Sequence, residues 1–149
     1  MKLENKVSVV TGGASGMGAA TVRAFAAAGG VVTLVDLDER DAFRIAGETG
    51  ATAVIGDVSD SAFCDRIIDD VVTACGRIDI LVNCAGIILR ANANGTTDED
   101  WRRLLAVNID GVFYMSRAAV RHMVAQSSGV IVNIGSIWGD VGATGAVAY

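Results

Sequence analysis

The stretch that decides the fold is VTGGASGMG, residues 10–18, which follows an apolar run and precedes an alanine-rich helical pattern. Its glycines at positions 12, 16 and 18 allow a tight turn and a close approach of the backbone to a ligand. A loop of this kind ends at a helix N-terminus, where backbone N–H groups bind phosphate well. The stretch therefore predicts a diphosphate-binding loop or, taken alone, an ordinary tight turn between a strand and a helix.

Short apolar runs and longer helical patterns alternate along the chain on both sides of this loop. The runs at 7–11, 31–36, 52–57, 78–83 and 130–134 are rich in β-branched residues, which is typical of strands covered on both faces. Helices are expected at 17–28, 38–49 and 61–75, and a long one from a capping box of Thr96 and Glu99 to about Val124. This alternation predicts an α/β fold with a parallel sheet.

Composition narrows the class of protein. The chain has 149 residues, of which 52% are apolar and 19% charged, so a single folded domain is expected. The net charge is −5, and no cluster of Lys and Arg marks a nucleic-acid surface. Three cysteines without paired spacing and a single histidine predict neither a disulfide framework nor a metal site. Without a signal-peptide core or a long apolar run, a cytoplasmic protein with no membrane partner is expected.

Asp36 ends the second apolar run, 18 residues after Gly18. An acid at about this distance from a glycine-rich loop accepts hydrogen bonds from the ribose of an adenine dinucleotide. A carboxylate there also repels the 2′-phosphate of NADP, and neither Ser15 nor Leu37 is basic, while Arg40 could reach in only from the next helix. The position favours NAD, although a helix-capping aspartate would also fit a strand end.

Two further strand ends carry candidate ligand-binding residues. GDV at 56–58 and NCAG at 83–86 are expected at the same edge of the sheet, where open α/β sheets bind their ligands. Asp57 can accept a hydrogen bond from an amine, and the small residues Ala85 and Gly86 leave room for a flat ring. Taken singly, each stretch could also be a plain turn.

Taken together and in order, these pieces resemble the short-chain dehydrogenase/reductase family. The matching pieces are TGGASGMG, Asp36, the DV at Asp57, NCAG, the VNIDG that contains Asn108, Ser136, and Tyr149 thirteen residues later. Cys84 stands where the family more usually has a second Asn. The resemblance covers all 149 residues, but only the front part of the family's fold.

The resemblance implies a doubly wound, Rossmann-like parallel sheet with strand order 3-2-1-4-5, and NAD as the cofactor. It implies a proton-relay water at Asn108, a hydrogen bond from Ser136 to the substrate oxygen, and Tyr149 as general acid/base. No metal is implied. The implied cofactor-binding residues are Gly12, Ser15, Gly16, Met17, Gly18, Asp36, Asp57, Val58, Asn83, Ala85 and Gly86.

The sequence thus predicts an NAD-dependent oxidoreductase that interconverts a secondary alcohol and a ketone, with no nucleic-acid partner. Three alternatives stay open: a catalytically silent dinucleotide-binding fragment, a 3-oxoacyl-carrier-protein reductase, and another enzyme on this fold such as a sugar-nucleotide epimerase. In the family, a lysine four residues after the tyrosine lowers the pKa of that tyrosine. We therefore expect residues 1–149 to be an incomplete dinucleotide-binding domain without a separate second domain, and the complete chain to continue past Tyr149 as a homodimer or homotetramer.

Overall fold

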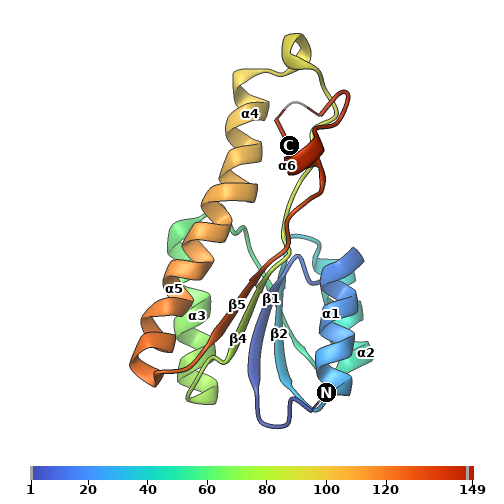
Figure 1. The fold of residues 1–149 in the computed structure, drawn as a ribbon. Helices are drawn as coiled ribbons and strands as arrows, with labels where there is room; N and C mark the ends of the chain where they lie inside the picture. Colours follow the sequence, from blue (N-terminus) through green and yellow to red (C-terminus); the bar gives the residue numbers. More distant parts are fainter. Residues whose placement is uncertain (1, 147) are drawn as a thin grey trace.

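The protein is an α/β structure in which one parallel sheet lies between two layers of helices. The computed structural model describes residues 2–146 and 148–149. Its five-stranded sheet has the order β3-β2-β1-β4-β5, and all four pairings are parallel. Helices α1 and α2 cover one face, while α3 and α5 cover the other (Figure 1). The predicted fold class and strand order are confirmed.

The strands and helices follow the alternation that the sequence predicts. The strands are β1 Val7–Thr11, β2 Val31–Asp36, β3 Thr52–Ile55, β4 Ile80–Asn83 and β5 Val130–Asn133. The helices are α1 Gly16–Ala27, α2 Glu39–Thr49, α3 Ser61–Cys75, α4 Asp98–Leu105, α5 Gly111–Gln126 and the short α6 Trp138–Val141. A 3-10 turn, η1 Ala93–Gly95, precedes α4, and a π-helical segment, η2 Ala106–Asp110, joins α4 to α5. The last three strands are one or two residues shorter than predicted at one end.

The long helix begins one residue later than predicted. Thr97, not Thr96, is the N-cap: its hydroxyl oxygen accepts a hydrogen bond from the Asp100 N–H at 3.1 Å and donates to the Asp100 carboxylate at 2.8 Å. The Thr96 hydroxyl instead donates to the Asn92 carbonyl at 2.9 Å. The predicted box of Thr96 and Glu99 is therefore wrong, because two threonines in a row offer two registers and Thr96 is used by the preceding turn.

Helices α2 and α3 begin and end at the residue types that are typical of helix caps. Asp38 and Asp60 cap α2 and α3, each accepting a hydrogen bond from a backbone N–H of the first turn. Gly50 and Gly76 end the same helices in the left-handed conformation, with φ of 74° and 76°. The chain can therefore turn back into the sheet directly after each helix.

The core consists of two apolar layers, one on each face of the sheet. On one face, Val9 and Leu81 of the sheet pack with residues of α3 and α5. On the other face, Val10 and Leu34 pack with Val22 and other residues of α1 and α2. All five residues of β1 are buried. Burial on both faces explains why these strands read as nearly continuous apolar runs.

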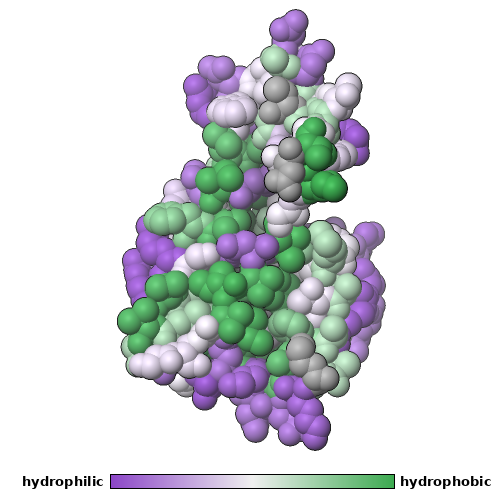
Figure 2. Space-filling model, viewed as in Figure 1, coloured by the Kyte–Doolittle hydropathy of each residue, from purple (hydrophilic) through white to green (hydrophobic). Residues whose placement is uncertain are grey.

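The edge strand β5 and the adjoining helix α5 keep an apolar surface. Figure 2 shows apolar side chains gathered over the lower half of the molecule, where Figure 1 places these two elements. Val130, Val132, Phe113, Val120 and Val124 are all at least 40% exposed. Among the described residues, no helix has both the length and the apolar character that crossing a membrane requires.

Candidate functional site: a cavity at the carboxyl edge of the sheet

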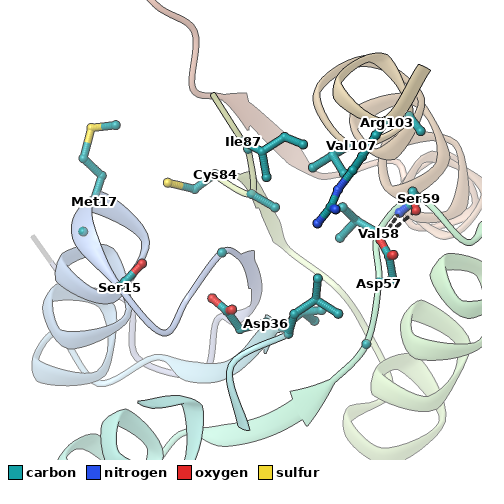
Figure 3. Close-up of a pocket in the computed structure, with 18 residues that line it drawn as sticks. Ser15, Met17, Asp36, Asp57, Val58, Ser59, Cys84, Ile87, Arg103 and Val107 are labelled. Atoms are coloured by element: carbon teal, nitrogen blue, oxygen red, sulfur yellow. Dashed lines mark hydrogen bonds between the residues drawn. The ribbon is translucent and has the colours of Figure 1, made fainter. Parts of the chain in front are cut away.

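A cavity of about 600 Å³ opens at the carboxyl edge of the sheet (Figure 3). The β1–α1 loop, the ends of β2 and β3, the segment after β4, and one side of α4 and η2 form its walls. Its size lies within the range of small-molecule and cofactor sites. Most residues that the sequence predicts for a cofactor site lie in this lining: Gly12, Ser15, Gly16, Met17, Asp36, Asp57, Val58, Ala85 and Gly86.

The glycine-rich loop depends on the absence of side chains at two positions. A Cβ on Gly12 would stand 2.8 Å from the backbone of Ala85, and a Cβ on Gly18 would overlap the Gly12 carbonyl oxygen. The Thr11 hydroxyl accepts hydrogen bonds from the N–H groups of Cys84 and Ala85, both at 3.1 Å, which joins the ends of β1 and β4. Gly18 thus supports the loop from beneath and does not line the cavity.

The N-terminus of α1 opens onto the cavity. Gly16 has a φ of +50°, and a Cβ there would meet open space. Ser15, the N-cap, makes no side-chain capping hydrogen bond, and the first turn holds no acidic residue. Backbone N–H groups of this turn are therefore available to an anion, and the positive end of the helix dipole favours one.

Asp36 connects the end of β2 to the glycine-rich loop. Its carboxylate accepts hydrogen bonds from the Ala14 N–H at 2.9 Å and from the Asp38 N–H at 3.0 Å. The cap of α2 is Asp38, so the alternative that Asp36 is a helix-capping residue is wrong. Figure 3 shows the Asp36 carboxylate directed into the cavity.

Asp57 and Val58 form the wall after β3. One Asp57 carboxylate oxygen accepts hydrogen bonds from the Ser59 N–H and hydroxyl, both at 2.8 Å. Val58 packs against Gly111 of α5, where an added Cβ would stand 2.8 Å from its side chain. The close approach at Gly111 brings the long helix onto this end of the cavity.

Asn83 lies beneath the cavity and is not part of its lining. It is 3% exposed, and its amide nitrogen donates to the Ser116 hydroxyl at 3.0 Å and to the Asn133 side-chain oxygen at 2.9 Å. The side chain points toward α5 and β5 because the residue alternation of β4 turns it to that face. The predicted place of Asn83 in the cavity wall is therefore corrected: it supports the wall from below.

Asn108 lies in the π-helical segment η2 and holds the segment after β4. Its side-chain oxygen accepts a hydrogen bond from the Ile87 N–H, and its amide nitrogen donates to the Ile87 carbonyl, both at 2.8 Å. Ile87 itself lines the cavity. Each end of the amide thus makes one hydrogen bond to Ile87, and one N–H and one oxygen lone pair remain. Single π turns inside α-helices are frequent at functional sites.

Ser136 and Tyr149 lie outside this cavity. They belong to the C-terminal segment that passes beside α4 at the end of the molecule away from α3 (Figure 1). The Ser136 hydroxyl oxygen accepts a hydrogen bond from the Trp138 N–H at 3.2 Å, and the Tyr149 ring meets the Trp138 ring edge-to-face with centroids 5.7 Å apart. Tyr149, Trp138 and Asn92 line a second hollow of about 400 Å³. The structure therefore gathers most of the predicted cofactor residues and places Asn108 beside Gly86 and Ile87 at their edge, but Ser136 and Tyr149 lie apart from them.

Other residues also line the cavity, although the sequence did not predict them as cofactor-binding residues. They are Val35, Leu37, Gly56, Ser59, Cys84, Ile87, Arg103, Ala106 and Val107. Arg103 and Val107 are four residues apart on one helix face, a spacing that was available in the sequence. No motif distinguishes Arg103 from its neighbour Arg102, so nothing in the sequence indicates which of the two faces the cavity.

The pKa values of two thiols near this site, Cys84 and Cys64, are both raised above the ordinary thiol value. Burial raises the pKa of Cys84, while a hydrogen bond from the Gly18 N–H acts in the opposite direction. Burial also raises the pKa of Cys64 to about 12, with the carboxylates of Asp60, Asp65 and Asp57 contributing. Among the described residues, no group of three or more His, Cys, Asp or Glu side chains is arranged to hold a metal ion.

Comparisons with known proteins agree with this geometry. A family model described as short chain dehydrogenase matches residues 6–149. A meso-2,3-butanediol dehydrogenase of Serratia marcescens is 38% identical over 100% of this chain and 60% of its own length. A galactitol 2-dehydrogenase (L-tagatose-forming) of Cereibacter sphaeroides is 39% identical over 94% of this chain and 56% of its own length. The crystal structure of NAD⁺-bound xylitol dehydrogenase superposes with a TM-score of 0.92 and 31% identity, covering all of this chain and 60% of the other.

Proposed function

Since this chain belongs to the short-chain dehydrogenase family, we propose that it is an NAD-dependent oxidoreductase that interconverts a secondary alcohol and a ketone. It spans about 60% of the length of the butanediol dehydrogenase and of the NAD⁺-bound xylitol dehydrogenase. The observation that carries the proposal is the Asp36 carboxylate, directed into a cavity that also opens on the N-terminus of α1.

The residues of the cavity fit a dinucleotide. The free N–H groups at Gly16 and its neighbours would hold the diphosphate, and Asp36 would accept hydrogen bonds from the adenosine ribose. The free carboxylate oxygen of Asp57 would accept one from the base amine, beside the apolar surface of Val58. NAD, when bound, carries the hydride. Gly12 and Gly18 keep the loop close enough to the sheet for this arrangement.

Three residues would move and hold the proton. Tyr149 would exchange a proton with the substrate oxygen as general acid/base, and Ser136 would donate a hydrogen bond to the same oxygen. The Ser136 hydroxyl oxygen already accepts from Trp138 N–H, which leaves its own proton free to donate. Asn108 would bind a relay water, while its side chain keeps the two hydrogen bonds that hold Ile87 in the cavity wall.

The substrate class proposed is a small polyhydroxy alcohol. The relatives named above are dehydrogenases of butanediol, galactitol and xylitol. The second hollow, lined by Asn92, Trp138 and Tyr149, would receive the carbon chain. A 3-oxoacyl-carrier-protein reductase is the second candidate, because a reductase of that kind from Thermotoga maritima is 35% identical over 100% of this chain and 63% of its own length.

Three further features belong to the proposal. Residues 1–149 act as one dinucleotide-binding domain, supported by the continuous five-stranded sheet. The protein forms a homo-oligomer through the apolar surface of α5, where Phe113, Val120 and Val124 are exposed. The cytoplasm is the proposed location, because the three cysteines are free, as in a reducing compartment.

Substitutions at the proton-transfer residues test the proposed function. In the full-length protein, Ser136→Ala and Tyr149→Phe should each lower kcat about 10²- to 10⁴-fold while NAD affinity stays near normal. Tyr114→Phe is the matched control, because Tyr114 is the other tyrosine of this chain and lies on α5 against Phe113. Ordinary turnover in Tyr149→Phe would contradict the mechanism. NAD binding without oxidation of any alcohol would support the silent dinucleotide-binding alternative, and a strong preference for acyl thioesters would support the second candidate.

A further inference from the structure

One cationic side chain enters the cavity at the carboxyl edge of the sheet. Of the residues that line it, only Arg103 is positively charged, whereas Asp36 and Asp57 are negative. Arg103 stands near the end of α4, one turn before Val107, which lines the same wall. Figure 3 shows the Arg103 guanidinium extending from the helix into the cavity.

The guanidinium of Arg103 is not held by the protein. Among the described residues it forms no ion pair or hydrogen bond, whereas the adjacent Arg102 pairs with Asp98 at 3.3 Å. The carboxylates of Asp36 and Asp57 are engaged with backbone N–H groups of Ala14, Asp38 and Ser59, and neither forms an ion pair with Arg103. The N–H donors of the Arg103 guanidinium are therefore available to a ligand in the cavity.

Arg103 lies at one end of the cavity. Figure 3 places its guanidinium beside Val58 and Val107, and places Ser15 and Met17 on the opposite side. The N-terminus of α1, which suits a phosphate, is thus remote from Arg103. Apolar side chains of Val58 and Val107 lie beside Arg103, next to the polar residues Asp57 and Ser59, and Val58 packs against the long helix through Gly111. A planar guanidinium next to apolar side chains can stack on a flat aromatic ring.

We propose that Arg103 is a cofactor-binding residue that stacks its guanidinium on the purine base of the dinucleotide, closing the base end of the cavity opposite Val58. This inference rests on the proposed function, since it assumes that the cavity binds a dinucleotide. The stacking acts on the adenine, which NAD, NADP and ADP-ribose share. Arg103 therefore adds affinity for all three by the same factor and does not discriminate between NAD and NADP.

Binding measurements on matched variants test this inference. Calorimetric titrations would use NAD, NADP and ADP-ribose with the unmodified protein, Arg103→Met and Arg103→Lys. Met keeps helix propensity and much of the side-chain length, so the fold is retained. We expect Arg103→Met to weaken all three ligands equally, by about three- to tenfold, and Lys to restore less than half of the lost free energy because it lacks the planar group. Arg102→Met, on the same helix turn but outside the cavity, should leave all three affinities unchanged.

The outcomes separate the two proposals. If the unmodified protein binds none of the three ligands, the proposed function fails. If it binds them and Arg103→Met binds equally well, the stacking inference alone is overturned. A loss confined to NADP would overturn it in favour of phosphate binding. A loss that Lys restores fully, or that disappears in about 0.5 M salt, would overturn it in favour of a general charge effect.

Discussion

The Asp36 carboxylate accepts a hydrogen bond from the Ala14 N–H at 2.9 Å, so the residue that ends β2 holds the loop that follows β1. The same carboxylate faces the cavity. One side chain therefore fixes the shape of the glycine-rich loop and sets the charge that a ligand meets. Removal of the Asp36 side chain would change both the loop and the charge, whereas an amide at this position would change mainly the charge.

The first prediction concerns cofactor preference. We expect the unmodified protein to bind NAD more tightly than NADP by several-fold to a hundredfold, about 1–3 kcal/mol, because a 2′-phosphate would face the Asp36 carboxylate. Asp36→Asn removes the charge but keeps one oxygen for the Ala14 N–H, so the preference should shrink while the loop stays in place. Asp36→Ala should lose the preference and also lower the melting temperature.

Titration of both cofactors into each variant measures this preference. The control is Asp38→Asn, which alters the cap of α2 outside the cavity and should leave the ratio of the two affinities unchanged. Equal affinity of the unmodified protein for NAD and NADP would contradict the role given to Asp36.

The second prediction concerns the glycine-rich loop. Gly18→Ala would place a Cβ onto the Gly12 carbonyl oxygen, which is backbone and cannot move away cheaply. We expect a loss of about 2–4 kcal/mol in the free energy of unfolding, or a displaced loop that no longer binds NAD. Urea unfolding and cofactor titration measure the two effects.

Gly47→Ala is the matched control for Gly18→Ala. Gly47 lies in α2, where an added Cβ meets nothing within 4 Å. Because alanine has the higher helix propensity, this change should stabilise the protein by up to about 1 kcal/mol. If Gly18→Ala is as stable as Gly47→Ala and binds NAD normally, the tight packing of the loop is not required.

The strands, the helices and most of the cavity lining were predictable from local patterns, whereas the strand order was implied by the family resemblance. Burial on both faces makes β1 and β2 continuous apolar runs, and the glycines at 50 and 76 mark the ends of their helices. The carboxyl ends of parallel strands meet at one edge, so residues far apart in the sequence, such as Gly16, Asp36 and Asp57, come to line one cavity.

Side-chain direction was harder to predict than element order. Asn83 is the last residue of β4, and its side chain donates to Ser116 of α5 beneath the sheet edge. The wall residue Ala85 lies beyond the end of the strand, where strand alternation no longer fixes side-chain direction. The π-helical segment that contains Asn108 has no sequence signal in a single chain, and it joins the helix that carries Arg103 to α5. Such details depend on the packing of the long helix against Val58.

The third prediction concerns Asp79, a buried carboxylate at the amino end of β4. It is 5% exposed and accepts hydrogen bonds from Lys6 Nζ at 3.1 Å, the Val7 N–H at 3.0 Å and Arg77 Nε at 2.8 Å. Burial acts to raise the pKa of Asp79, but these three donors outweigh it and leave the pKa lowered. The carboxylate therefore stabilises the fold above the ordinary aspartate pKa of about 4, and this contribution is lost as the pH falls through the folded-state value.

Asp79→Asn should lower the free energy of unfolding by about 1–3 kcal/mol near neutral pH, toward the smaller figure because Lys6 and Arg77 are half exposed. The difference from the unmodified protein should narrow as the pH falls from about 4, where Asp79 of the unfolded chain becomes protonated, toward the lower pKa of the folded state. Urea unfolding across this pH range measures it. Asp98→Asn, at a position 90% exposed, should change stability by less than about 0.5 kcal/mol. A difference that stays constant with pH would show that the charge of Asp79 is not the cause.

The fourth prediction concerns the three thiols, which the fold places in three environments. Cys75 is exposed at the end of α3, Cys84 is half buried in the cavity, and Cys64 is fully buried with its thiol donating to the Val58 carbonyl at 3.1 Å. Burial raises the pKa of Cys84 and raises that of Cys64 to about 12, so both hold little of the reactive thiolate near neutral pH. We expect an alkylating reagent to modify Cys75 first, Cys84 slowly, and Cys64 only after unfolding.

Bound cofactor should distinguish Cys84 from Cys75, because only Cys84 lines the cavity. At a free NAD concentration about ten times its Kd, alkylation of Cys84 should slow about tenfold while that of Cys75 is unchanged. Without NAD, the rate at Cys84 should still be rising above pH of about 8.5, where an ordinary thiol is half ionised. Peptide mapping by mass spectrometry follows each site separately, and Cys75→Ser removes the fast phase as a check on the assignment. If a saturating amount of NAD leaves the Cys84 rate unchanged, the cofactor does not occupy the part of the cavity that Cys84 lines.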